Sequence, residues 1–177
     1  LPFVTKKNYK IIYCVRTNSQ QKQVLRELKA FAKAGTKISV VAIQGRESMC
    51  PQQKNDNELA KSNWSEKSKI CKSLKLQSKM GEAGCPYYRK LLRPTKNLVE
   101  NWSSKVYSAE EFTENAEKEG ICPYELNKLL LKEAQVVIVP YVYFFESFIR
   151  KYLLGWMNTS IDNVITIVDE AHNLPDW

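Results

Sequence analysis

Two adjacent carboxylates and the only histidine of the chain follow a short apolar run. The run is Val-Ile-Thr-Ile-Val at 164–168, and Asp169, Glu170 and His172 come directly after it. A continuous apolar run bounded by polar residues is typical of a buried strand in a parallel sheet. Ligands of open α/β sheets bind just beyond the carboxyl ends of such strands. We therefore predict that Asp169 holds a Mg²⁺ ion on nucleotide phosphates and that Glu170 polarises the attacking water.

A bare acidic pair at this place has a simpler explanation, because acidic residues are favoured in the first turn of a helix. The full string Asp-Glu-Ala-His at 169–172 is more specific than a bare pair and favours the nucleotide interpretation. A lone histidine is usually an ordinary core or surface residue. Its place in this string predicts a functional role for His172.

Four of the five cysteines lie in or beside a polar segment that begins near residue 45. They are Cys50, Cys71, Cys85 and Cys122, and none shows the short Cys-x₂₋₄-Cys spacing that structural zinc prefers. Three of them precede a proline, which biases the preceding residue towards extended geometry. A Cys-Pro step also closes the cysteine run of bacterial ferredoxins, and four thiolates suit a 4Fe-4S cluster. We predict such a cluster, with zinc and four ordinary thiols as the less favoured alternatives.

The same polar segment carries most of the positive charge of the chain. Residues 51–105 hold twelve basic and five acidic side chains, and the net charge of the whole chain is +8. Aromatic stacking combined with cations is the chemistry of single-strand binding, although a solvated basic face is the alternative. The aromatic residues interleaved with the bases are Tyr87, Tyr88, Trp102 and Tyr107. Tyr88, Arg89 and Lys90 are the residues that we predict to contact DNA.

The first elements that must position these residues form a strand–helix–strand unit. A β-branched and aromatic run predicts a strand at 9–15, and the run 37–43 predicts a second. Between them, apolar residues recur at helical spacing from Val24 to Ala32, with Asn18 or Ser19 as the expected cap and Gly35 as the stop. This order predicts a parallel sheet. Cys14 lies inside the first strand and is expected to be a core residue.

The aliphatic character returns after the polar segment. We predict a short helix at 126–130, a strand at 134–139 stopped by Pro140, and a helix at 141–156. The last helix has an aromatic face that we expect to pack in the core, formed by Tyr141, Tyr143, Phe144, Phe145 and Phe148. We therefore expect an α/β fold made by residues 1–44 and 123–177 and interrupted by a small, mainly helical insert at 45–122. The insert has too few aliphatic residues to bury a core of its own easily, so a metal centre would stabilise it.

The composition and the net charge of the chain exclude some classes of protein. A hydrophobic content of 44% argues against wholesale disorder, and a pI near 9.2 favours a polyanionic partner. No apolar run reaches the length of a membrane span, so we expect no membrane partner. An odd number of cysteines favours an intracellular, reduced protein over a disulfide framework. The chain starts at Leu1 and lacks the Gly-x₄-Gly-Lys-Ser/Thr phosphate loop, so we expect an internal piece of a larger enzyme.

Five sequence motifs, taken together, resemble those of XPD-type helicases, and archaeal members most closely. They occur in the family's order, as Tyr-Cys-Val-Arg-Thr-Asn-Ser-Gln at 13–20, Gln-Gly-Arg-Glu-Ser-Met-Cys at 44–50, Gly-Cys-Pro-Tyr-Tyr at 84–88, Gly-Ile-Cys-Pro-Tyr-Glu at 120–125 and Val-Asp-Glu-Ala-His-Asn-Leu at 168–174. The resemblance implies part of a RecA-like first motor domain with an iron–sulfur domain inserted at 45–122. It implies an ATP-dependent helicase that moves 5′ to 3′ and acts on single-stranded and forked DNA.

The resemblance also implies roles for single residues. Cys50, Cys71, Cys85 and Cys122 would ligate the 4Fe-4S cluster, Asp169 and Glu170 would serve ATP and Mg²⁺, and His172 would couple the ATP state to the rest of the motor. Arg16 and Thr17 would lie at a DNA-facing motif, although Thr17 could merely cap a helix. The phosphate loop, the arch domain and the second motor domain are absent, so we expect the chain alone to be inactive. The implied location is the cytoplasm of an archaeal cell, associated with the nucleoid, or the nucleus of a eukaryote.

Two other classes of function remain open from the sequence. The first is a non-catalytic iron–sulfur or zinc module that binds single-stranded DNA, which the missing phosphate loop would favour in a complete chain. The second is a nuclease or redox protein, which is less favoured because nothing in the sequence resembles the metal cluster of a nuclease.

Overall fold

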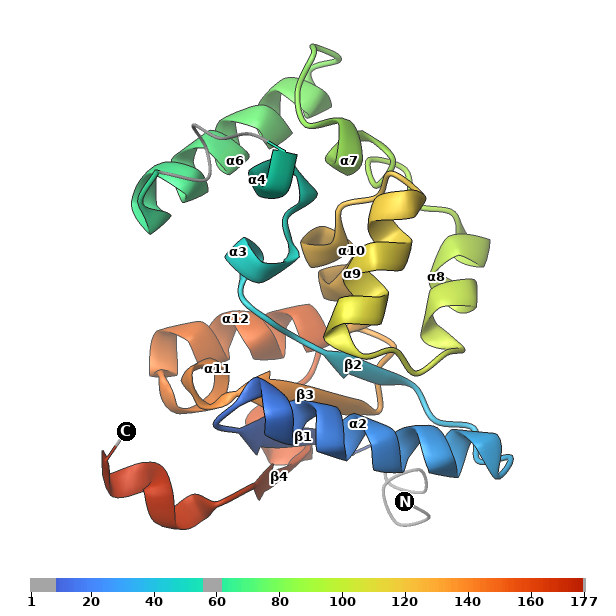
Figure 1. Ribbon diagram of the computed structural model, residues 1–177, viewed down its shortest axis with the longest axis vertical. Helices are drawn as coiled ribbons and strands as arrows, with labels where there is room; N and C mark the ends of the chain where they lie inside the picture. The colour runs from blue at the N-terminus through green and yellow to red at the C-terminus, as the bar shows by residue number, and fades with distance from the viewer. Residues whose placement is uncertain (1–8, 56–61, 177) are drawn as a thin grey trace.

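The computed structural model describes residues 9–55 and 62–176 of the chain (Figure 1). Its four strands are β1 (Lys10–Val15), β2 (Val40–Ala42), β3 (Val136–Pro140) and β4 (Val164–Val168). Its longer helices are α2 (Asn18–Lys33), α6 (Trp64–Lys79), α8 (Lys96–Ser103), α9 (Ala109–Lys118), α10 (Pro123–Leu130) and α12 (Ser147–Met157). Its short helices are α3 (Arg46–Met49), α4 (Pro51–Asn55), α7 (Pro86–Arg89), α11 (Tyr141–Phe145) and the 3₁₀ turns η1 (Ile161–Asn163) and η2 (Ala171–Asp176).

The strands form one parallel sheet in the order β2-β3-β1-β4. Tyr13 of β1 pairs with Ile138 of β3 on one side and with Ile167 of β4 on the other. The predicted α/β class, with a parallel sheet interrupted by a mainly helical segment, is therefore confirmed. Strand β2 is only three residues long, and it pairs with β3 rather than with β1.

The period of two along the strands divides the core between the two faces of the sheet. Ile12 and Cys14 face a large cluster that includes α10, α12 and several residues of the insert. Val15 and Ile138 face the opposite side, where Leu25 of α2 covers them. The helices α3 to α9 lie above the face covered by α12, as the teal, green and yellow ribbons in Figure 1 show.

Among the described residues, the apolar side chains of the insert join the core of the sheet and form no core of their own, as the sequence predicts. Leu91, Trp102, Phe112, Ala116 and Ile121 are buried in the same cluster as the sheet residues. Trp102 and Phe112 pack edge to face, with ring centroids 5.0 Å apart. The apolar residues of the insert are few, but α8 and α9 bury them against strand β2 and helix α10 instead of forming a separate core.

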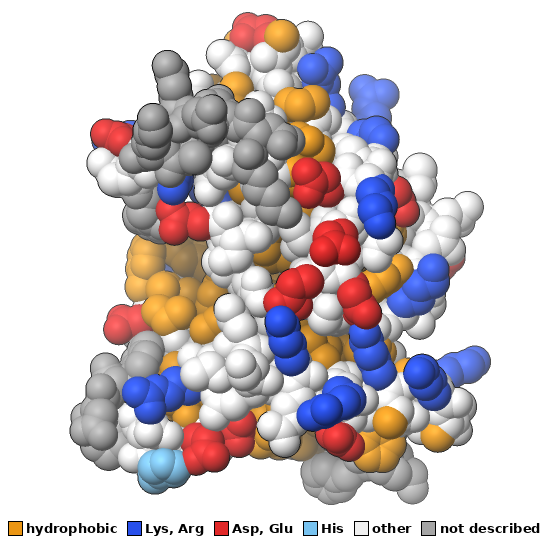
Figure 2. Space-filling model, viewed as in Figure 1, with side chains coloured by type: hydrophobic (Ala, Val, Ile, Leu, Met, Phe, Trp, Pro, Cys, Tyr) orange, Lys and Arg blue, Asp and Glu red, His pale blue; other side chains and the backbone are white. Residues whose placement is uncertain are grey.

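Two ion pairs join helix α9 of the insert to helix α2, which covers the opposite face of the sheet. Lys22 of α2 lies 3.0 Å from Glu110 of α9, and Lys29 of α2 lies 2.5 Å from Glu111. Figure 2 shows acidic side chains beside basic side chains on this face of the molecule. Because all four side chains are partly exposed, the pairs orient the two helices and contribute little stability.

Two expectations about the elements need correction. The helix predicted at 141–156 is broken at Glu146, whose ψ of 110° separates α11 from α12. In addition, β4 is half-buried rather than fully buried, with Ile167 40% exposed. The reason is its place at an edge of the sheet, since no strand among the described residues pairs with its outer side. No helix among the described residues is long and apolar enough to cross a membrane.

Candidate functional site

The predicted acidic residues lie at the carboxyl ends of β4, β1 and β3. Asp169 follows β4 directly, and its backbone amide donates to the carbonyl of Cys14 in β1 at 3.0 Å. Tyr141 begins α11 after β3, and its buried hydroxyl donates to the carbonyl of Asp169 and lies 3.2 Å from that of Glu170. Burial and the nearby Asp169 carboxylate raise the pKa of Tyr141, so the hydroxyl remains a donor. The ends of three strands are thus joined at the acidic pair.

Glu170 occupies an unusual backbone conformation. Its φ is +50°, in the left-handed region that a non-glycine residue rarely adopts. The turn is closed by Asn173, whose backbone amide donates to the carbonyl of Glu170 at 2.9 Å and whose side-chain amide donates to it at 3.1 Å. The carboxylate of Glu170 lies 3.2 Å from Nδ1 of His172. The exposed histidine lies beside acidic side chains on the surface (Figure 2).

The predicted DNA-facing residues lie next to this turn. Nη1 of Arg16 donates to Oδ1 of Asn173 at 2.7 Å. Thr17 is the N-cap of α2, since its hydroxyl accepts from the amide of Gln20 while the Gln20 side chain accepts from the amide of Thr17. The cap predicted at Asn18 or Ser19 is therefore wrong by one or two positions, and the capping role considered for Thr17 is the one observed.

A groove of about 1000 Å³ borders the acidic pair on the face of the sheet that carries α2. Its floor is apolar and includes Tyr13, Leu28 and Ile167, while Asp169 and Glu170 line one end. Phe31 of α2 lies in its wall and is 52% exposed. The carboxylates therefore face open space at the place where a parallel sheet binds its ligands.

The four predicted ligand cysteines lie in four different segments of the chain. Cys85 and Cys122 are the N-caps of α7 and α10, Cys50 precedes α4, and Cys71 lies inside α6. All four cysteines are half-buried, and burial, together with the nearby Cys85 and Cys50, raises the pKa of Cys122. Backbone hydrogen bonds join these segments, from the amide of Cys85 to Leu74 of α6 at 3.2 Å and from the amide of Cys122 to Tyr87 at 2.9 Å.

Burial determines the protonation of these thiols in the free protein. It raises the pKa of Cys50, Cys71 and Cys122, the last to about 12. The Arg46 guanidinium acts in the opposite direction on Cys50 and Cys71. Since a metal centre binds thiolates, its binding would release protons from this site.

The donor set of four thiols fits an iron–sulfur cluster in chemistry. Among residues 9–55 and 62–176, however, no group of three or more His, Cys, Asp or Glu side chains is arranged to hold a metal ion. The predicted cluster and its four ligands therefore stay predictions. Cys14 is fully buried in the sheet, as the sequence predicts.

The sequence does not predict a half-buried ion-pair network that lies beside the cysteines. Glu125 of α10 accepts from Lys75 of α6 at 2.7 Å and from Lys128 at 3.1 Å. Burial opposes ionisation of Glu125, yet the two lysines hold its pKa below the ordinary value. The Lys75 ammonium also lies 5.5 Å from the centroid of the Tyr88 ring. The network joins the helix that carries Cys71 to the helix capped by Cys122.

The aromatic and basic residues predicted to bind DNA differ in accessibility. Arg89 and Lys90 are both exposed, although the Lys90 ammonium donates to the carbonyl of Glu119, and Tyr88 is half-buried. Trp102 is 5% exposed, and Tyr107 packs on it with centroids 5.3 Å apart, so a stacking role for Trp102 is wrong. Lys61, which counts towards the charge of this segment, lies outside the described residues.

The aromatic face predicted for residues 141–156 is only partly in the core. Tyr141 and Tyr143 are buried, Phe144 and Phe145 are half-buried, and Phe148 is 69% exposed. The break at Glu146 turns α12 away from the direction of α11, so a single helical spacing does not continue across it.

Three residues at these sites escape prediction from sequence. Tyr141 follows a strand directly, which places it at the same edge as Asp169, and this position is the signal that could have identified it. Asn173 lies within the acidic motif itself. Glu125 has no signal of this kind, because its partner Lys75 is fifty positions away in sequence.

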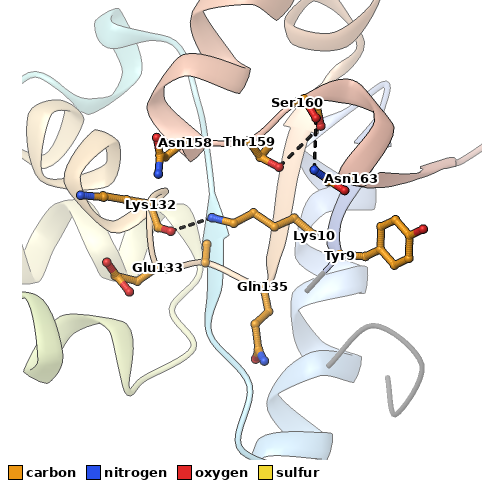
Figure 3. Close-up of a pocket in the computed structure, with 10 residues that line it drawn as sticks. Tyr9, Lys10, Lys132, Glu133, Gln135, Asn158, Thr159, Ser160 and Asn163 are labelled. Carbon is orange, nitrogen blue, oxygen red and sulfur yellow. Dashed lines mark hydrogen bonds between the residues drawn. The ribbon is translucent and has the colours of Figure 1, made fainter. Parts of the chain in front are cut away.

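A second pocket lies at the opposite end of the sheet (Figure 3). Lys10 reaches into it from the start of β1, and its ammonium donates to the carbonyls of Leu131, Lys132 and Met157 at 3.2, 2.6 and 2.8 Å. Those carbonyls end α10 and α12, where cations are favourable. All three donors of the ammonium are used, so Lys10 has a structural role at this end.

Comparison with known proteins gives consistent matches. The DEAD_2 family matches residues 13–177. A regulator of telomere elongation helicase 1 from Mus spretus is 29% identical over 171 residues, and a homolog from Aedes aegypti is 31% identical over 165 residues. Each alignment covers 93% of this chain but only 12% and 15% of the respective relative. Both of these relatives are eukaryotic, so the expected closeness to archaeal members stays a prediction.

Two solved structures share the fold. One, described as XPD_Helicase, has a TM-score of 0.54 and 21% identity and covers 94% of this chain and 25% of its own. The other, described as Truncated XPD, has a TM-score of 0.55 and 22% identity and covers 93% of this chain and 41% of its own.

Proposed function

The chain belongs to the DEAD_2 family, and from this premise we propose that it is part of an ATP-dependent DNA helicase of the XPD type. In this proposal, residues 1–44 and 123–177 form part of the first motor domain and residues 45–122 form an iron–sulfur insert. A longer polypeptide would supply the phosphate loop and the second motor domain, and the chain alone would not turn over ATP. The predicted 5′ to 3′ direction on single-stranded and forked DNA belongs to this proposal.

The observation that carries the proposal is the acidic pair at the joined ends of three parallel strands. Asp169 would hold Mg²⁺ on the β- and γ-phosphates, as the corresponding acid does in nucleotide-hydrolysing motors. Glu170 would accept a proton from the attacking water, and His172 lies close enough to its carboxylate to respond to that change. The groove beside both carboxylates supports this assignment, because it leaves room for a ligand.

The four cysteines would ligate a 4Fe-4S cluster, whose chemistry here would be to cross-link four segments of the insert. The backbone bonds between the cysteine segments and the Lys75–Glu125 ion pair support this assignment, because they join the segments that carry Cys71, Cys85 and Cys122. Arg16, Arg89, Lys90 and Tyr88 would contact single-stranded DNA, and the exposed guanidinium of Arg89 supports this part.

The test is the replacement Glu170→Gln in the longer enzyme that contains this chain. We expect the rate of ATP hydrolysis to fall roughly a hundredfold or more, as for loss of a general base, with ATP binding retained. The matched control is Asp162→Asn, because Asp162 is an exposed acid in η1 at the other end of β4. Near-normal turnover of Glu170→Gln would exclude this role and favour the alternative, a non-catalytic single-stranded DNA-binding module with an iron–sulfur or zinc centre.

A further inference from the structure

We propose that Asn173 is a positioning residue that transmits the state of Arg16 to the turn carrying Glu170. This inference rests on the proposed function, in which Arg16 contacts DNA and Glu170 serves nucleotide hydrolysis. In this inference, the side chain of Asn173 connects the DNA-contacting site at Arg16 to the nucleotide site at Glu170.

The link consists of two hydrogen bonds that meet on one amide group. The oxygen of the Asn173 side chain accepts from Nη1 of Arg16 at 2.7 Å, and its nitrogen donates to the carbonyl of Glu170 at 3.1 Å. The side chain is planar and rigid at the amide, so a shift of the guanidinium changes the direction in which the nitrogen points. Arg16 and Glu170 therefore cannot move independently while both bonds persist.

The backbone turn at Glu170 keeps its conformation only through contacts with neighbouring residues. Glu170 has a φ of +50°, and a non-glycine residue keeps this conformation only when neighbouring contacts hold it. The Tyr141 hydroxyl fixes the turn from the buried side, whereas Asn173 holds it from the solvent side. The contact from Asn173 is the one that a ligand can reach, because Arg16 is exposed.

The contact also affects the Glu170 side chain. The same nitrogen of Asn173 lies 3.1 Å from Nε2 of His172, and Nδ1 of that ring lies 3.2 Å from the Glu170 carboxylate. A phosphate bound to Arg16 would compete for its guanidinium, and the resulting movement of Asn173 would reach both the backbone and the carboxylate of Glu170. The contacts therefore couple the end of β1 to the end of β4 in both directions.

The first experiment uses the chain without ligand. We expect Asn173→Ala and Arg16→Ala each to raise the amide hydrogen exchange of residues 169–174 by roughly two- to tenfold, as for loss of one hydrogen bond, and the double variant to add little more. Arg16→Lys should restore part of the protection, because an ammonium can also donate to Asn173. Additive effects of the two alanine variants, or no effect of either, would overturn the link.

A variant of Asn173 separates the two halves of the link. Asn173→Asp keeps an acceptor for Arg16 but removes the donor to the carbonyl of Glu170. It should raise exchange at 169–174 as much as Asn173→Ala does while leaving the chain folded by circular dichroism. The matched control is Asn163→Ala, since Asn163 bonds only locally to Ser160 among the described contacts. Protection equal to that of the parent in Asn173→Asp would contradict the proposal.

The second experiment adds a single-stranded oligothymidine as the probe. We expect its binding to change exchange at 169–174 in the parent, and this change to disappear in Asn173→Ala although the oligothymidine still binds. A change of equal size in Asn173→Ala, or none in the parent despite binding, would overturn the transmission. Failure of the probe to bind would contradict the proposed DNA role, and the ligand-free comparison would still decide whether Asn173 positions the turn.

Discussion

The hydroxyl of Tyr141 donates to the carbonyl of Asp169, so the residue that follows β3 holds the residue that follows β4. The two are linked only through the fold, since twenty-eight positions separate them in sequence. The buried tyrosine thereby sets the orientation of the peptide between the two predicted catalytic acids.

Replacing Tyr141 by phenylalanine should weaken this anchor without opening a cavity. We expect the free energy of unfolding to fall by about 1 kcal/mol, because one buried hydrogen bond is lost. Urea unfolding followed by circular dichroism measures this change. Tyr152→Phe is the matched control, since Tyr152 is half-exposed on α12, and an equal effect of both changes would contradict the role of Tyr141.

The stability of the contact between α6 and α10 should depend on pH through Glu125. Burial alone would raise the pKa of this carboxyl, but Lys75 and Lys128 lower it overall. A lowered folded-state pKa adds stability that is present above the unfolded value and is lost as the pH falls through the folded value. The free energy of unfolding of the parent should therefore exceed that of Glu125→Gln at neutral pH, and this difference should shrink below the ordinary carboxyl pKa of 4.5.

Urea unfolding of both proteins from about pH 6 down to about pH 3 measures this difference, and the other carboxyl groups contribute equally to both. Glu82→Gln is the control, because Glu82 is exposed. A stability difference between parent and Glu125→Gln that stays constant over this range would contradict the assignment.

Gly84 is required by close packing just before Cys85. A Cβ atom at this position would meet the carbonyl oxygen of Leu74 and the hydroxyl of Ser78 and would lie 2.5 Å from the amide of Ser78. Gly84→Ala should therefore destabilise the chain by roughly 1–3 kcal/mol, as for overpacking. The same change at Gly155 in α12, where a Cβ meets nothing within 4 Å, should stabilise by about 0.5–1 kcal/mol. Thermal unfolding should give a lower melting temperature for Gly84→Ala and a higher one for Gly155→Ala, and changes of the same sign would contradict this prediction.

The metal content of the chain tests the cysteine assignment. Anaerobic purification should yield iron and sulfide with the visible absorbance of a 4Fe-4S cluster, and Cys85→Ser should lose both iron and helical structure in the insert. Cys14→Ala should keep the iron, because Cys14 is buried in the sheet. One bound zinc without iron, in protein expressed with ample iron, would rule out the cluster.

Single-stranded DNA binding should depend on Arg89 in a sequence-independent way. Arg89→Ala should weaken binding similarly for all sequences and reduce the salt slope by about one unit, as for loss of one phosphate contact. Fluorescence anisotropy at several salt concentrations measures both quantities, with Arg26→Ala as the control because Arg26 is exposed on α2. Unchanged affinity and slope for Arg89→Ala would leave the basic insert as a solvated face.

The sequence predicts the strands better than the contacts between distant segments. Continuous apolar runs locate β1 and β3 to within two residues, because strand formation follows local hydrophobicity. The half-burial of β4 depends on which strands lie beside it, and the apolar run at 164–168 carries no such information. Likewise, the cysteines and acids can be identified by residue type, whereas Glu125 and Asn173 gain their roles from partners that only the fold brings near.

The strand order also has a consequence for biosynthesis. Ile11 pairs with Val136 on one side and with Ile165 on the other, and the described part of the chain gives it no earlier partner in the sheet. At typical translation rates, β1 therefore leaves the ribosome on the order of ten seconds before β3 is available to pair with it. During that interval its apolar residues and backbone hydrogen-bonding groups have no partner strand. Helix α2 is synthesised directly after β1, and it can cover one face of this strand before β3 is available.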